Sequence, residues 1–214
     1  FITAITYHKP YKTEIDGKTY NFCAMAETAG CHKPCLFTAG RGQMNSVQQS
    51  RYNKTVQFFT NRVQYMDDLN NDLTTFSRRA RANGIQPCYR PNGTSDYPWH
   101  NTGIMSLFNE VQFYDYTKIV KRAYETLPEN YHLTLSYSEH NQDYAASVIK
   151  AVLDTGINMA VVFRNKDKPK KFLGLDVIDG DQDDLRFLDP QGVVVGLYAK
   201  GKAKQDTSGF VIDA

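Results

Sequence analysis

The chain has 214 residues, of which 41% are hydrophobic, 22% charged and 13% aromatic, and its net charge is +2. This balance predicts a folded globular protein with a full core and argues against disorder, and so small a charge does not indicate nucleic-acid binding. No apolar run approaches the ~20 residues that cross a bilayer. Since the first residues also lack the pattern of a secretion signal, we expect no membrane association and a reducing, cytosolic setting.

The first 84 residues contain a predicted hairpin, a loop and a long helix. Residues 1–20 should form an N-terminal hairpin, because they include an Asp-Gly pair typical of tight turns. Residues 21–45 hold several glycines and prolines, so we predict a loop there, named the cysteine loop below. After Ser46, a suitable N-cap, apolar residues three or four positions apart predict one helix over 47–82, ended by an Asn-Gly pair.

From residue 85 on, predicted strands and helices alternate. The strands are 85–90, 111–116, 131–137, 158–163 and 192–198, the helices are 104–108, 119–126 and 143–154, and residues 199–214 form a charged tail. Such alternation argues for parallel strands with right-handed crossovers. Because a closed eight-unit barrel ordinarily needs about 250 residues, we predict a single α/β domain over residues 1–214 with a partial parallel barrel of about six strands. A doubly wound open sheet is the alternative.

Three of the four cysteines, Cys23, Cys31 and Cys35, lie in the cysteine loop. In a reducing compartment, clustered cysteines indicate metal ligands or catalytic thiols before disulfides. Soft sulfur ligands favour zinc or an iron–sulfur cluster, and C-x7-C-x3-C lacks the C-x2-C pairs of zinc sites. We therefore predict an iron–sulfur cluster, of the 4Fe-4S type, with one iron open to a substrate or cofactor. Cys88 fits a buried apolar side chain slightly better than a fourth ligand.

Polar residues that follow the strands are candidates for binding a small molecule or nucleotide, since ligands of parallel α/β folds collect at the carboxyl ends of strands. These candidates are Asn92, Ser95, Asp96, Asp115, Lys118, Ser138 and Glu139. The turn 92–96 suits a ribose, an amino-acid group or a phosphate. An Asx-turn that caps the next helix explains the same residues equally well. Nothing in the sequence identifies a catalytic residue.

Several motifs are specific enough to suggest a family. They are the Cys-x3-Cys-Leu-Phe of the cysteine loop and the segments 90–96, 113–118, 177–181, 185–190 and 206–210. Together they resemble a group of bacteriophage proteins akin to the gene-product-88 family, over residues from about 20 to 212. The resemblance implies a phage-encoded protein that works in the host cytoplasm, and it implies no activity.

The three-cysteine loop on a partial α/β barrel is also similar to radical S-adenosylmethionine enzymes. This similarity implies redox or radical chemistry on a small molecule or nucleotide, with S-adenosylmethionine as a cofactor. The loop of those enzymes reads C-x3-C-x2-C, and here residues 92–96 stand in only loosely for their Gly-Gly-Glu-type segment. These two differences from the enzymes argue against the binding of S-adenosylmethionine more than against the binding of an iron–sulfur cluster. Two alternatives remain open, a zinc-stabilised non-catalytic module that contacts a host protein and a nucleic-acid-binding phage protein.

Overall fold

The structure, a computed structural model that describes residues 1–213, divides into two compact units. The first unit contains residues 1–23, 44–115 and 126–132, and the second contains the rest of the chain. Both units are α/β with mostly parallel strands, which confirms the predicted fold class at this level. No helix in residues 1–213 has the length and apolar character needed to span a membrane.

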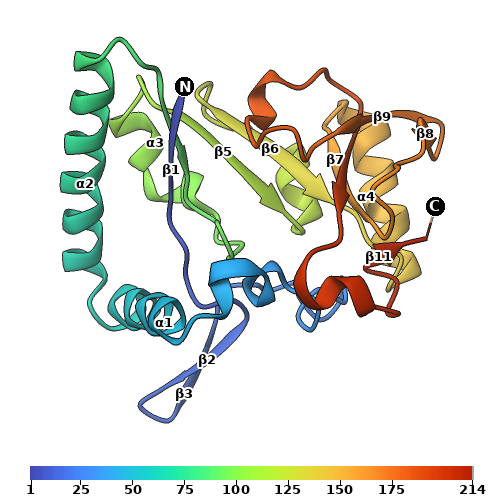
Figure 1. The fold of residues 1–214 in the computed structure, drawn as a ribbon. Coiled ribbons are helices and arrows are strands. Elements are labelled where there is room, and N and C mark those ends of the chain that lie inside the picture. The colour runs from blue at the N-terminus through green and yellow to red at the C-terminus, as the bar shows by residue number, and fades with distance from the viewer. Residues whose placement is uncertain (214) are drawn as a thin grey trace. The chain divides into compact units, whose positions relative to one another are not determined.

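In the first unit, three parallel strands pair in the order β1–β4–β5 (Figure 1). The strands are β1 (Ile2–Ile5), β4 (Pro87–Arg90) and β5 (Gln112–Thr117), with a separate hairpin of β2 (Lys12–Ile15) and β3 (Lys18–Asn21). The helices are α1 (Asn45–Thr60), α2 (Arg62–Ala82), α3 (Ile104–Leu107) and the 3-10 helix η3 (Trp99–Thr102). Along α2, buried residues three or four positions apart, such as Leu69 and Leu73, form the apolar face of an amphipathic helix.

The predicted hairpin is confirmed, but residues 1–20 also hold a strand that the sequence did not reveal. The hairpin turns at Asp16 and Gly17, whose φ angles of 49° and 74° suit the positive-φ turn that joins two short antiparallel strands. Residues Ile2–Ile5 instead pair with β4 as the first strand of the parallel sheet. The first core strand therefore precedes the hairpin and does not run directly into the cysteine loop.

The prediction of a single helix over 47–82 is wrong, because the helix is interrupted at Asn61. Its φ of −140° and ψ of 67° are not helical, so α1 ends there, and its side chain accepts a hydrogen bond from the Gln64 N–H at the start of α2. The apolar spacing continues across the break, which explains why periodicity alone missed it. The segment predicted as a helix over 119–126 contains a 3-10 helix, η4 (Val120–Tyr124), in place of an α-helix.

In the second unit, the strand order is β6–β7–β10–β9–β8, with β11 also paired to β7. The strands are β6 (Tyr131–Ser136), β7 (Met159–Phe163), β8 (Lys171–Phe172), β9 (Leu175–Asp179), β10 (Val194–Tyr198) and β11 (Val211–Ile212). The helices are α4 (Gln142–Thr155) and the 3-10 helices η1 (Leu36–Thr38), η2 (Gly40–Gln43), η4 (Val120–Tyr124), η5 (Arg186–Leu188) and η6 (Gly201–Gln205). Neither this strand order nor that of the first unit closes into a barrel.

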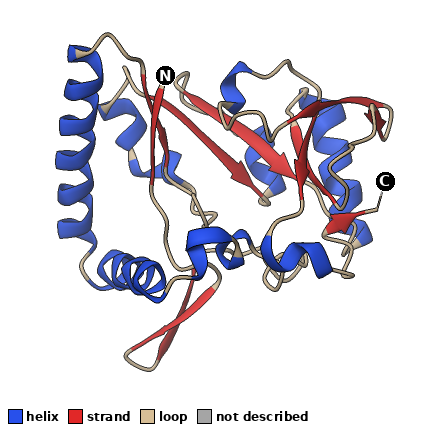
Figure 2. Ribbon diagram, in the orientation of Figure 1, coloured by secondary structure: helices blue, strands red, loops and turns tan. Residues whose placement is uncertain are grey.

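The core of the second unit forms where α4 packs on its strands (Figure 2). Val148 and Val152 of α4 are buried with Val161 and Phe163 of β7, the near-continuous apolar strand that the sequence predicted. Residues 199–213, expected as a tail, carry η6 and β11. Because Val211 and Ile212 are buried and paired with β7, this segment is part of the fold.

Candidate functional site

Asn92 organises the turn at the carboxyl end of β4. Its side-chain oxygen accepts hydrogen bonds from Ser95 Oγ at 2.8 Å, the Tyr97 N–H at 3.0 Å and Trp99 Nε1 at 3.2 Å. Its side-chain nitrogen donates to the Tyr97 carbonyl at 2.9 Å and to Asp115 Oδ2 at 2.8 Å. These partners lie three to seven residues further along the chain rather than two, and η3, the next helix, has no side-chain cap, so the turn is not the helix-capping Asx-turn that the sequence offered as one of two explanations. The role of this turn in binding a ligand stays a prediction.

Asp115, on β5, is fully buried and joins the two neighbouring strand ends of the first unit. One carboxylate oxygen accepts from the Asn92 backbone N–H at 3.0 Å, and the other accepts from Tyr131 Oη at 3.2 Å in addition to the Asn92 amide. A buried carboxylate is stable only with several donors of this kind. Asn92, Ser95, Asp96 and Asp115, all predicted candidates, therefore lie together at one end of the sheet.

Cys23 lies against the same turn. Its thiol is 3.9 Å from the Thr94 carbonyl and accepts a hydrogen bond from the Tyr11 N–H at 3.3 Å. The neighbouring Phe22 carbonyl accepts from the Asp96 N–H at 2.9 Å. The hairpin that precedes the cysteine loop therefore returns the chain to the carboxyl end of β4, which places the first loop cysteine at the edge where parallel sheets bind ligands.

His8 fills the centre of an aromatic cluster just after β1. Its ring centroid is 4.5 Å from that of Phe22, 5.6 Å from that of Phe58 and 6.0 Å from that of Trp99. Its Nε2 is hydrogen-bonded to Tyr65 Oη at 2.8 Å. Burial above all, and then the nearby charges of Lys54 and Arg62, lower the pKa of His8 to about 3, so the ring is neutral in the folded protein.

Cys31 belongs to the second unit and follows a tight turn. The Cys31 N–H donates to the Ala26 carbonyl at 3.0 Å, and Gly30 before it has a φ of +66°. A Cβ on Gly30 would lie 2.5 Å from the His140 ring, so only glycine allows this close approach. Because His140 follows the end of β6, Cys31 also lies next to the carboxyl end of a strand in its own unit.

Cys35 is the residue that precedes η1. Its carbonyl accepts hydrogen bonds from the Thr38 hydroxyl at 2.8 Å and the Thr38 N–H at 3.1 Å. The same hydroxyl accepts from the Lys202 N–H at 3.2 Å, which ties this end of the cysteine loop to η6. Since η6 follows the last residues of β10, Cys35 too belongs to a segment fixed near a strand end.

Ser138 and Glu139, two further candidates, continue from β6. Ser138 is fully buried, and its hydroxyl accepts from the His140 N–H at 3.2 Å and donates to the Gly209 carbonyl at 3.3 Å. Glu139 accepts from Tyr137 Oη at 3.4 Å. Burial, followed by the charge of Glu139, raises the pKa of Tyr137 to about 12. Lys118, the remaining candidate, places its ammonium 5.6 Å from the centroid of the Phe210 ring.

Cys88 differs from the three loop cysteines. It is fully buried inside β4, where it pairs with Thr3 of β1 and Gln112 of β5, and burial raises the pKa of its thiol. Cys23, Cys31 and Cys35 are each partly exposed, and all four cysteines are thiols rather than disulfides. A strand-interior position favours the packing role for Cys88 that the sequence also allowed.

The comparison with protein families agrees with the motifs found in the sequence. The family model described as Gene product 88 matches residues 2–214. The chain belongs to this phage gene-product family. No curated protein and no solved structure is significantly similar to it.

The thiols of this Gene product 88 chain are divided between the two units. Cys23 belongs to the first, and Cys31 and Cys35 belong to the second. Within residues 1–213, no three His, Cys, Asp or Glu side chains are grouped as the ligands of a metal ion. The prediction that the three thiols share one metal centre therefore depends on their chemistry and on the position of each within its own unit.

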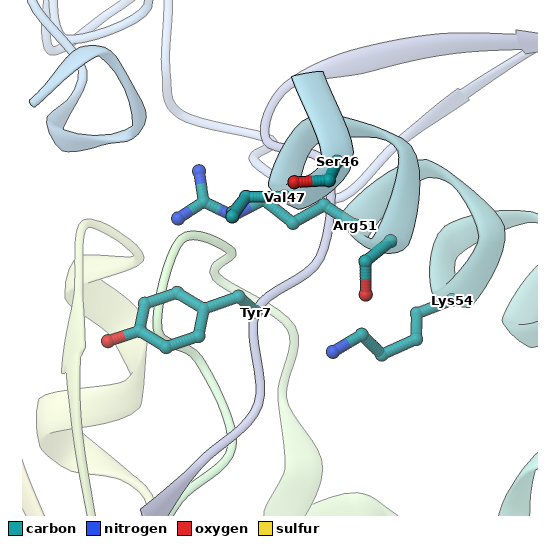
Figure 3. A pocket seen from close by; sticks show the side chains of 6 residues that line it. Tyr7, Ser46, Val47, Arg51 and Lys54 are labelled. Atoms are coloured by element: carbon teal, nitrogen blue, oxygen red, sulfur yellow. The ribbon is translucent and has the colours of Figure 1, made fainter. Parts of the chain in front are cut away.

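Sequence reasoning missed a cavity of about 210 Å³ in the first unit, between the start of α1 and the segment after β1 (Figure 3). Six residues line it, and they are Tyr7, Ser46, Val47, Ser50, Arg51 and Lys54. A signal was present in the sequence, because Ser46, Ser50 and Lys54 are spaced by four residues and share one face of a helix.

Proposed function

We propose that Cys23, Cys31 and Cys35 are the ligands of an iron–sulfur cluster, of the 4Fe-4S type, in a phage-encoded protein of the host cytoplasm. The observation that carries the proposal is the position of each thiol within its own unit. Cys23 contacts the turn after β4, Cys31 lies next to His140 after β6, and Cys35 is tied to η6 after β10. The carboxyl ends of parallel strands are where α/β proteins assemble their sites.

The donor set suits this cofactor in chemical terms. Three partly exposed thiols outside any disulfide are accessible to iron, and thiolate sulfur is the ligand of nearly all such clusters. Cys88, which is buried within a strand, does not have this access. A cluster held by three cysteines would supply redox chemistry and an iron open to a small molecule, nucleotide or S-adenosylmethionine. We include in this proposal the partial parallel barrel that the sequence predicts, with the cluster at the carboxyl ends of its strands.

The residues near Cys23 would contribute binding and orientation rather than redox chemistry. The Ser95 hydroxyl is held by its hydrogen bond to Asn92, so a ligand at this edge would meet this hydroxyl and the Asp96 carboxylate at defined positions. In the second unit, Glu139 would have the same function next to Cys31, and the buried Ser138 would position this segment through its hydrogen bonds to His140 and Gly209. Lys118 is the candidate that adds a positive charge.

Anaerobic purification and reconstitution with iron and sulfide test this proposal. We expect a brown protein with broad absorbance near ~400 nm and iron and sulfide in the ratio of a cluster. Cys23→Ser, Cys31→Ser and Cys35→Ser should each lose most of this absorbance, whereas the matched control Cys88→Ser should keep it. Absence of iron after anaerobic reconstitution would overturn the proposal. One zinc per chain without colour would favour the zinc-stabilised module instead.

A further inference from the structure

The cavity at the start of α1 is lined by two cations and by no acidic side chain of the described residues. Arg51 is 7% exposed, and Lys54 is half-buried one turn further along the helix. Figure 3 shows both side chains on the side of the helix that faces Tyr7. Side chains that carry the same charge are ordinarily separated or paired with acids, because their proximity costs free energy.

Arg51 contacts an aromatic ring of the segment after β1. Its guanidinium carbon lies 5.1 Å from the centroid of the Tyr7 ring, within the range of a cation–π contact. That ring in turn packs on Gly93, where a Cβ would lie 2.5 Å from it. Gly93 belongs to the turn after β4, and its N–H donates to the Thr6 carbonyl at 2.9 Å. The cavity therefore lies at the carboxyl ends of β1 and β4, the usual ligand edge of a parallel sheet.

Lys54 forms no hydrogen bond or ion pair with any of residues 1–213. Burial, and then the charge of Arg51, lower its pKa from the ordinary value for lysine. The charge of Lys54 also contributes to the low pKa of the buried His8. The ammonium thus lies in a partly desolvated place where a negative charge would stabilise it.

The helix supplies further donors on the same face. Ser46 and Ser50 add two exposed hydroxyl groups to the lining. Residue 44, before the first turn of α1, is a methionine and makes no side-chain cap, and the first turn contains no acidic residue. Ser46 and Val47 of the lining belong to the first turn of this 16-residue helix, where the helix dipole favours a negative charge.

We propose that this cavity binds the phosphoryl group of a small ligand, with Arg51 and Lys54 as its charged donors and Ser46 and Ser50 as its hydroxyl donors. A tetrahedral oxyanion has enough acceptor oxygens for donors that arrive from several directions, and Arg and Lys are the usual residues for phosphate. The cavity volume of about 210 Å³ is below that of pockets for whole drug-sized ligands, so it holds this group rather than an entire molecule. The inference is independent of the proposed cluster, because none of its residues is a thiol.

Calorimetric titration of the full chain at constant ionic strength tests the inference with inorganic phosphate, adenosine 5′-monophosphate and adenosine. We expect saturable binding of phosphate, of the mononucleotide, or of both, and none of adenosine. Tighter binding of the mononucleotide than of phosphate would show that the ligand extends beyond the phosphoryl group.

Lys54→Gln should weaken binding about tenfold, which corresponds to about 1.4 kcal/mol. Ser50→Ala, a smaller change on the exposed rim, should weaken it less. Lys18→Gln removes the same charge from the exposed hairpin turn and should leave binding unchanged. Circular dichroism melting of each variant confirms that it folds, and buried Arg51 is left intact for this reason.

Three results would overturn the inference. The first is no saturable binding of phosphate or mononucleotide below about 1 mM. The second is equal affinity in wild type, Lys54→Gln and Lys18→Gln. The third comes from a separate titration with a short oligonucleotide at several salt concentrations. Binding of the oligonucleotide alone, with a steep salt dependence that Lys54→Gln does not change, would indicate a diffuse nucleic-acid surface.

Discussion

Replacing Asn92 by aspartate changes one atom at the centre of the turn after β4. The carboxylate oxygen that corresponds to Oδ1 can still accept from Ser95, Tyr97 and Trp99. The amide nitrogen is lost, and with it the hydrogen bonds to the Tyr97 carbonyl at 2.9 Å and to Asp115 Oδ2 at 2.8 Å. An oxygen would then face two acceptors, one of them the buried carboxylate of Asp115.

The expected loss of stability follows from these two bonds. A hydrogen bond between neutral groups contributes about 1 kcal/mol and one to a charged group about 2 kcal/mol, so the free energy of unfolding should fall by about 3 kcal/mol at pH 7, before repulsion is added. For a chain of this length, that corresponds to a melting temperature lower by about 6–12 °C. Urea titration and thermal melting, both followed by circular dichroism, measure the two quantities.

The pH dependence provides a second readout. Two adjacent buried carboxyl groups do not both ionise readily, so the folded variant holds a proton to a higher pH than the unfolded chain does. A raised pKa in the folded state contributes stability at low pH that is lost as the pH rises. The deficit of the Asn92→Asp variant relative to wild type should therefore shrink between pH 7 and pH 5.

Asn71→Asp is the matched control, since Asn71 is exposed on α2 and the substitution adds the same charge. The reasoning is refuted if Asn92→Asp unfolds within about 1 kcal/mol of Asn71→Asp at pH 7, because changes at exposed sites are ordinarily smaller than this. It is also refuted if the deficit grows as the pH falls.

Gly30→Ala should lower the free energy of unfolding by about 1–3 kcal/mol more than Gly84→Ala, since both have a φ of +66° but only the Gly30 Cβ would meet His140; equal urea midpoints would contradict this. His8, whose pKa burial lowers to about 3, takes up a proton mainly in the unfolded chain, so wild type should lose about 2 kcal/mol of stability between pH 7 and pH 5. His8→Phe should lack this loss, and parallel pH profiles of the two proteins would refute the interpretation. Buried Cys88, with its raised pKa, should react with iodoacetamide about tenfold more slowly than the loop cysteines in the native protein, and as fast as they do in urea. Peptide mass spectrometry measures these rates, and fast native labelling of Cys88 would contradict its burial.

Much of the fold could be predicted because it depends on neighbouring residues. The Asp-Gly pair at positions 16 and 17 determines the hairpin turn through its positive φ angles. The apolar run over 159–163 predicts a buried strand, and α4 follows its apolar spacing. The break at Asn61 and the strand at residues 2–5 were missed, since the first interrupts an otherwise continuous period and the second is a strand only through its pairing with β4.

The sequence by itself determined the alternation of strands and helices over residues 85–163, the family, and the concentration of thiols in one loop, because these are properties of adjacent residues and of motifs. Only the tertiary structure decided which polar groups serve the fold and which line a cavity. Asn92 and Asp115 satisfy each other by hydrogen bonds across 23 positions, whereas Lys54 has no partner among the described residues and lines a cavity with Tyr7. The hydrogen-bond partners and solvent exposure of a side chain depend on segments far apart in the chain, so local residue preferences could not predict them.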